Sequence, residues 1–131
     1  MTAIRFLLVD DNEDGVEALA SLLEDEGHET QIALTAKSAL AMFELARPEV
    51  VVVDIGLPDM DGFDLAVEMR RRFGNDFRLV AFTGYDKPEL RQRALGCGIN
   101  AFVTKPFKPT TLDALIGKTS KPDVAPPQPR T

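Results

Sequence analysis

Short apolar runs alternate five times with longer amphipathic segments over most of this 131-residue chain. The apolar runs have the length of β-strands rather than of helices. We predict strands at residues 4–9, 30–34, 50–53, 79–82 and 101–103. Between them, apolar side chains recur at helical spacing, as Val16, Leu19 and Leu23 do after the first run. Strands that alternate with helices in this way predict an α/β fold.

The third run, Val50–Val53, is apolar at every position, which is typical of a parallel strand buried on both faces. Right-handed crossovers would place helices on both sides of such a sheet. We therefore expect a five-stranded parallel sheet in a doubly wound (βα)5 fold. A flavodoxin-like strand order of 2-1-3-4-5 would make the apolar third strand central and the weaker second strand an edge.

The charge of the chain argues against direct contact with nucleic acid, because 15 basic and 21 acidic residues give a formal net charge of −6. No apolar run approaches the roughly 20 residues of a membrane span, so no membrane contact is expected. The N-terminus has no pattern of a secretory signal. Cys97 is the only cysteine, which excludes a disulfide framework within one chain and favours a cytoplasmic protein.

Residues 1–117 are expected to form one domain. Residues 118–131 contain four prolines and almost no apolar side chains, which is typical of a disordered tail or the stub of a linker. Asp86, with an acid three residues on, is predicted to cap the fourth helix, and a last helix is expected over residues 109–116. The single histidine, His28, and the basic run at residues 70–72 are predicted to lie on the surface.

The side chains that can carry chemistry follow the predicted strands. Ligands in doubly wound sheets bind outside the carboxyl ends of the strands, near the point where the strand order reverses. The first strand is followed by Asp10 and Asp11, and its expected neighbour, the third, by Asp54. The fourth and fifth strands lead into Thr83 and Lys105. We expect all five side chains in one crevice.

Three carboxylates in one crevice repel one another unless a cation lies between them. Mg²⁺ binds one or two carboxylates and keeps water or phosphate oxygens as its other ligands, so the set suits a metal together with a phosphoryl group. Lys105 would neutralise the phosphoryl oxygens, Thr83 would donate a hydrogen bond, and a carboxylate would accept the group as an acyl phosphate. Asp10 and Asp11 could instead cap the first helix, although the matching residues at the other strand ends disfavour this.

Five segments resemble the receiver domains of two-component response regulators. They occur in the order of that family, and the resemblance covers residues 4–117. The segments are residues 6–11 (FLLVDD), 51–58 (VVVDIGLP), 60–62 (MDG), 82–84 (FTG) and 104–106 (TKP). Both stand-alone receivers and the receivers of hybrid sensor kinases are similar to this chain.

The resemblance implies that a histidine kinase or a histidine phosphotransfer protein phosphorylates Asp54. It implies that Mg²⁺, with Mn²⁺ as a substitute, binds Asp54, Asp11 and the backbone carbonyl of Gly56 directly, and Asp10 through water. It also implies a cis peptide bond between Lys105 and Pro106. The domain would be a regulatory phosphoacceptor rather than an enzyme, with magnesium-dependent self-phosphorylation and autodephosphorylation.

In the family, a switch pairs the positions of Thr83 and Phe102. Phosphorylation would draw Thr83 toward the phosphoryl group, and Phe102 would turn inward. A downstream protein would read the face formed by the fourth helix, fifth strand and fifth helix, and the chain would be a monomer or a phosphorylation-dependent dimer. Gly56 and Tyr85 would tune the lifetime of the phosphoryl group, and our hypothesis is that Tyr85 partly shields it.

Two other functions compete with the phosphorylation switch. A receiver-like interaction module that works without phosphorylation would have no need of the intact set of site residues. A phosphatase or mutase with a nucleophilic aspartate would carry a second acid two residues after the nucleophile, and that position is Gly56. The switch is therefore the leading hypothesis.

Overall fold

The computed structural model describes residues 3–84, 87–106, 108 and 111–117. The described residues do not include the expected tail at residues 118–131. They also do not include Tyr85, expected to tune the phosphoryl lifetime, or Asp86, the predicted helix cap. Within the described part, no helix combines the length and the apolar character needed to cross a bilayer.

Five strands and five helices alternate along the chain, as predicted. The strands are β1 (Arg5–Val9), β2 (Glu29–Ala33), β3 (Val50–Val53), β4 (Arg78–Thr83) and β5 (Ala101–Thr104). The helices are α1 (Glu13–Asp25), α2 (Ala36–Ala46), α3 (Gly62–Phe73), α4 (Pro88–Gly96) and α5 (Thr111–Ile116). Each strand lies within one residue of its predicted bounds. Apolar runs mark four of the strands locally, whereas the edge strand β2 (ETQIA) carries only a weak apolar signal.

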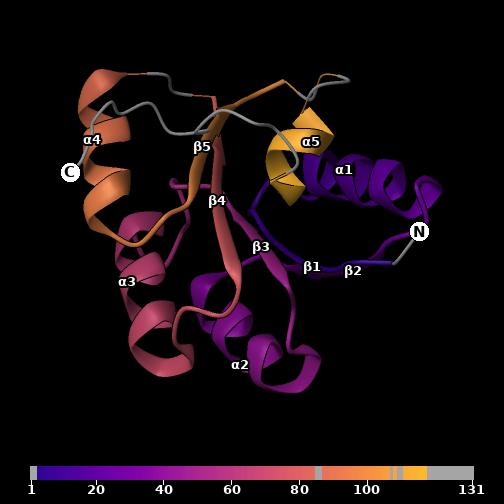
Figure 1. Ribbon diagram of the computed structural model, residues 1–131, viewed down its shortest axis with the longest axis horizontal. Coiled ribbons are helices and arrows are strands. Elements are labelled where there is room, and N and C mark those ends of the chain that lie inside the picture. The colour runs from indigo at the N-terminus through magenta and orange to yellow at the C-terminus, as the bar shows by residue number, and fades with distance from the viewer. Residues whose placement is uncertain (1–2, 85–86, 107, 109–110, 118–131) are drawn as a thin grey trace.

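The five strands form one parallel sheet in the order β2-β1-β3-β4-β5, which confirms the doubly wound, flavodoxin-like prediction. Helices α1 and α5 lie on one side of the sheet, and α2, α3 and α4 lie on the other (Figure 1). Strand β3 is buried at all four positions, as expected for the centre of such a sheet. In register, Val9 pairs with Val53, so β1 and β3 end side by side.

Side chains cap the N-termini of three helices. Asn12 accepts a hydrogen bond from the N–H of Gly15 at the start of α1, Thr35 caps α2, and Asp61 caps α3. Helix α4 begins differently, because Lys87 rather than the predicted Asp86 occupies its N-cap position and makes no side-chain capping bond. A proline at the first position, Pro88, is instead preorganised for the helical backbone.

The surface position predicted for His28 is wrong. Its side chain is only 5% exposed, and its ring packs edge-on against Phe6 with the ring centroids 5.4 Å apart. The imidazole Nδ1 accepts a hydrogen bond of 3.1 Å from the backbone N–H of Ile4. Among the described residues, the buried Nε2 has no hydrogen-bond partner. His28 is therefore a packing residue that joins the start of β2 to the start of β1.

The sequence predicted that the whole basic run at residues 70–72 lies on the surface. This prediction is wrong for Arg70. Arg70 is half-buried, and its guanidinium donates hydrogen bonds to the carbonyl oxygens of Gly98 and Phe77 and to the side chain of Asn100. Burial lowers the pKa of Arg70 from its usual value. Arg70 thus fastens the end of α3 to the connection between α4 and β5, whereas its neighbours Arg71 and Arg72 pair with Glu68 on the surface.

Candidate functional site

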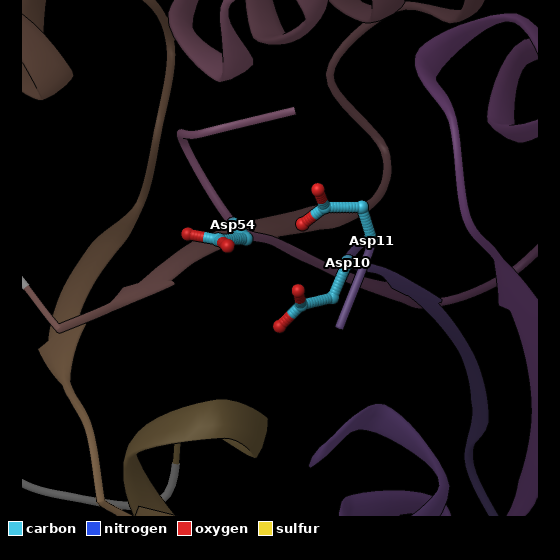
Figure 2. Close-up of side chains that lie close together, drawn as sticks. All are labelled: Asp10, Asp11 and Asp54. Atoms are coloured by element: carbon cyan, nitrogen blue, oxygen red, sulfur yellow. The ribbon is translucent and has the colours of Figure 1, made fainter. Parts of the chain in front are cut away.

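Three carboxylates converge at the carboxyl end of the sheet. One oxygen of each of Asp10, Asp11 and Asp54 lies within 4.8 Å of the others. Figure 2 shows the three side chains projecting together from the ends of β1 and β3. The backbone fixes this placement, because the N–H of Asp54 donates to the carbonyl of Val9 at 2.9 Å. Asp10 is buried, Asp54 is partly buried and Asp11 is exposed.

Lys105 brings a positive charge to this cluster from the end of β5. Its Nζ donates to Oδ2 of Asp10 at 2.7 Å and lies 3.8 Å from Oδ2 of Asp54. The backbone N–H of Lys105 donates to the carbonyl of Thr83 at 2.7 Å, which holds the residue against the end of β4. The peptide bond between Lys105 and Pro106 is cis.

Burial raises the pKa of Asp54, and the negative charge of Asp10 raises it further. The ammonium of Lys105 and the N–H of Gly56 oppose this rise. Three carboxylates and one ammonium leave two negative charges in the cluster. A hard divalent cation would balance them and would favour the ionised form of Asp54, so the residues present fit Mg²⁺.

Two glycines shape the segment that follows Asp54. A Cβ atom added to Gly56 would meet no heavy atom within 4 Å, so its backbone lies open to a ligand. A Cβ added to Gly62 would lie 2.5 Å from the Cα of Ile55 and 2.7 Å from the carbonyl oxygen of Asp54. Gly62 therefore lets the start of α3 pack directly on the backbone of Asp54 and Ile55. The sequence showed Gly62 only as part of the motif at residues 60–62 and gave no sign of this close approach.

Asp59, in the loop after β3, joins two segments that are far apart in the sequence. Its two carboxylate oxygens accept hydrogen bonds from the backbone N–H groups of Ala36 (2.9 Å) and Lys37 (3.0 Å). These two bonds lower the pKa of Asp59. Asp59 thus ties the segment after Asp54 to the N-terminus of α2, a contact that only the packing of α2 beside this segment creates.

The two predicted switch residues lie on β4 and β5. Thr83 is fully buried at the end of β4 and pairs in register with Thr104. Phe102 is 2% exposed, and the guanidinium of Arg91 on α4 lies over its ring at 4.9 Å from the centroid. The ring is already buried in this state, so any inward turn would be a rearrangement between two covered positions.

One hollow adjoins the carboxylate cluster and another adjoins Phe102. A pocket of about 290 Å³ adjoins the carboxylate cluster and is lined by Asp10, Asn12, Gly15, Val16, Ala18, Leu19, Leu22, Phe82, Lys105 and Pro106. A second, of about 250 Å³, lies at the face formed by α4, β5 and α5. It is lined by Arg91, Phe102, Val103, Thr104, Lys108, Thr111 and Ala114. The expected active-site residues and the expected output face therefore adjoin separate hollows.

Comparisons with known proteins agree with this architecture. The sequence profile of the response regulator receiver domain matches residues 6–117. The chain is 40% identical to an uncharacterized 14.6 kDa protein in the sodA1 3′ region of Leptolyngbya boryana, over 88% of this chain and 89% of that protein. It is 35% identical to the aerobic respiration control sensor protein ArcB of Escherichia coli K12, over 90% of this chain and 15% of ArcB. The crystal structure of a CheY-like receiver domain protein from Methanospirillum hungatei matches with a TM-score of 0.81 at 32% identity, over 89% of this chain and 93% of that one.

A doubly wound parallel sheet with an acidic cluster at the carboxyl ends of β1 and β3 defines a domain of the flavodoxin-like class with a CheY-like site. The chain belongs to the response regulator receiver domain family of two-component signalling. Members of this family are regulatory phosphoacceptors that bind Mg²⁺ in an acidic pocket and interact with histidine kinases and downstream effectors. Because the chain spans only 15% of ArcB, the activity of that whole protein does not transfer to it.

Proposed function

We propose that this chain is a phosphorylation-driven switch in which Asp54 accepts a phosphoryl group. The donor would be a histidine kinase, a histidine phosphotransfer protein or a small acyl phosphate. The observation that carries the proposal is the convergence of Asp10, Asp11 and Asp54 within 4.8 Å, with Lys105 Nζ 3.8 Å from the acceptor. The similarity to a segment of the sensor protein ArcB supports a place in a sensory signalling pathway, and we propose that this pathway is a phosphorelay. A lone thiol such as Cys97 suits the reducing cytoplasm.

Asp11, Asp54 and the backbone carbonyl of Gly56 would hold Mg²⁺ directly, and Asp10 would hold it through water, with Mn²⁺ as a substitute. The bound ion supplies charge neutralisation for the oxygens of the transferred phosphoryl group. The open space beside Gly56 supports this assignment, because no side chain blocks its carbonyl group.

A carboxylate oxygen of Asp54 would attack the phosphorus while the bond from phosphorus to the donor nitrogen breaks. The electron pair of that bond stays with the donor imidazole, and the product is an acyl phosphate on Asp54. Lys105 would move its Nζ from Asp10 to a phosphoryl oxygen, and the hydroxyl of Thr83 would donate to another. Attack of water on the same phosphorus would later return the carboxylate and release inorganic phosphate.

The new charge on Asp54 would bias the packing of Thr83 and Phe102 and so change the face formed by α4, β5 and α5. The contact between Arg91 and the ring of Phe102 supports this, because a change in the ring position would disturb α4. A partner protein would read the changed face, and the hollow of about 250 Å³ there offers it a concave contact.

The test is to incubate the purified chain with Mg²⁺ and acetyl phosphate and to measure its intact mass. We expect a gain of one phosphoryl group that is absent in Asp54→Asn and strongly reduced in Asp11→Ala by loss of the metal. Asp14→Ala is the matched control, because Asp14 is an acid in the first turn of α1 outside the cluster. A folded wild-type chain that gains no mass would favour the phosphorylation-independent interaction module instead.

A further inference from the structure

Helix α4 packs on the hydrophobic core through Ala94 and the partly buried Leu90, and two of its arginines make further contacts with neighbouring elements. Of its nine residues, all described, Ala94 alone is buried. Two arginines lie over phenylalanine rings of neighbouring elements. Arg91 covers Phe102 on β5 at 4.9 Å from the ring centroid, and Arg93 covers Phe63 on α3 at 4.6 Å. With only a small apolar surface buried, the arginine contacts add to the hold on α4.

Arg93 also pairs with two acids at the start of α3, the N-cap Asp61 and the first-turn Asp64. Its Nη1 lies 3.3 Å from Oδ2 of Asp61, and its Nη2 lies 3.8 Å from Oδ1 of Asp64. The other carboxylate oxygen of Asp61 accepts the N–H of Phe63 at 2.7 Å and so caps α3. We call Arg93, Asp61 and Asp64 the α3–α4 clasp.

The clasp is joined by the backbone to the phosphoacceptor. Asp61 forms an isolated antiparallel β-bridge with Gly56, whose backbone carbonyl is expected to bind the metal. The N–H of Gly62 donates to the carbonyl of Ile55 at 2.9 Å, and Gly62 packs against the carbonyl of Asp54. The loop of residues 54–62 is thereby closed on itself, so a displacement at Gly56 must also displace Asp61.

We propose that Arg93 is a positioning residue that couples α4 to the phosphoacceptor loop through the α3–α4 clasp. The clasp holds α4 in its resting position, and the rearrangement of the loop around metal and phosphoryl group alters that hold. The change of this hold on phosphorylation rests on the proposed function, whereas the hold itself does not. The route is separate from the one through Thr83 and Phe102, because it runs through α3 rather than through β4 and β5.

Hydrogen exchange of the α4 amides, residues 89–96, measures the hold directly. Arg93→Gln removes the cation, and Asp61→Asn removes the charge of its partner while keeping an excellent helix cap. Arg93→Lys restores a positive charge without the fork of the guanidinium. Arg72→Gln is the matched control, because it breaks an exposed pair with Glu68 on α3 that has no link to the loop.

In the metal-free protein, we expect α4 amides to exchange about twofold to fivefold faster in Arg93→Gln, because exposed ion pairs are individually weak. Asp61→Asn should have a similar effect, the double variant should add little to Arg93→Gln, and Arg93→Lys should recover part of the protection. Arg72→Gln should match the wild type. Unchanged exchange in Arg93→Gln, or fully additive effects of the two substitutions, would overturn the clasp.

The coupling is tested with Mg²⁺ and beryllofluoride, an analogue of the phosphoryl group. We expect their addition to change α4 exchange in the wild type and to change it by less than half as much in Arg93→Gln. An equal response in the two proteins would overturn the coupling. A wild-type chain that does not bind beryllofluoride would contradict the proposed function, and the metal-free comparison would then decide on the clasp alone.

Discussion

The ammonium of Lys105 donates to Asp10 at 2.7 Å, although the two residues are 95 positions apart in the chain. The same ammonium is 3.8 Å from the carboxylate of Asp54. The positive charge expected to receive the phosphoryl group is thus bonded to Asp10, beside Asp54 where it would act. It offsets part of the repulsion among the three carboxylates, so Lys105 and a metal ion have overlapping electrostatic roles.

Lys105→Met should therefore move two properties in opposite directions. Loss of the ammonium should slow phosphorylation by acetyl phosphate about 10- to 100-fold, because a preorganised donor to the transferred group is lost. The same loss leaves the carboxylates uncompensated, so the affinity for Mg²⁺ should rise. Intact-mass kinetics and calorimetric titration with Mg²⁺ measure the two effects. Weaker binding of Mg²⁺ by the variant would contradict this account.

The raised pKa of Asp54 predicts a pH dependence of both binding and stability. Protonated Asp54 can neither bind Mg²⁺ nor attack phosphorus. As pH falls, both activities should therefore be lost at a higher pH than they would be if Asp54 had the ordinary aspartate pKa of 3.8. In the metal-free protein, the ionised carboxylate disfavours the folded state at every pH above its raised pKa. Asp54→Asn should therefore raise the free energy of unfolding at neutral pH.

This stabilisation by Asp54→Asn should shrink as pH falls through the raised pKa and disappear below the unfolded value of 3.8, where both side chains are neutral. Urea unfolding at a series of pH values without metal measures it. Saturating Mg²⁺ should reverse the order of stability at neutral pH, since only the wild-type carboxylate binds the ion. A variant that is less stable than the wild type in metal-free neutral buffer would refute the argument.

Gly62→Ala should destabilise the domain by about 1–3 kcal/mol, because the new methyl group would overlap the backbone of Ile55 and Asp54. The displaced acceptor loop should also weaken the binding of Mg²⁺. Gly96→Ala is the control, since a Cβ at Gly96 meets nothing within 4 Å. That substitution should leave stability unchanged or raise it slightly. Equal unfolding midpoints for the two variants would show that the close approach at Gly62 is unimportant.

His28→Leu should lower the free energy of unfolding by about 1–3 kcal/mol, because the N–H of Ile4 would lose its acceptor in a partly buried setting. His28→Asn should lose less, since its side-chain oxygen can occupy the place of Nδ1 and accept the same bond. Chemical denaturation of the two variants and the wild type provides the ranking. If leucine is tolerated as well as asparagine, the packing of His28 rather than its hydrogen bond stabilises this corner.

Tyr85→Ala should shorten the lifetime of the phosphoryl group on Asp54, if the ring shields the acyl phosphate from water as its place two residues after Thr83 suggests. Decay of the phosphorylated mass after removal of acetyl phosphate measures the lifetime. Leu45→Ala, at a highly exposed apolar position on α2, is the control. A lifetime equal to that of the wild type would exclude shielding by Tyr85.

The sequence by itself determined the alternation of strands and helices and the carboxylates that follow β1 and β3. These features are predictable because periodicity, apolar runs and the residue after a strand are local properties. The doubly wound arrangement followed from the rule on handedness, and the strand order followed from the apolar third strand and the weaker second strand. The convergence of Asp10 and Asp54 followed from that order. Both predictions needed no knowledge of particular side-chain contacts.

Only the tertiary structure decided which side chains meet across long distances in the chain. The residues around His28 predict a surface turn, yet the start of β1, 24 positions away, supplies its hydrogen-bond donor. The capping of α2 by Asp59 and the pairing of Arg93 with Asp61 likewise join elements that are not adjacent in sequence. Such contacts depend on how helices pack against loops, and a polar side chain looks the same in a sequence whether packing buries it or solvent surrounds it.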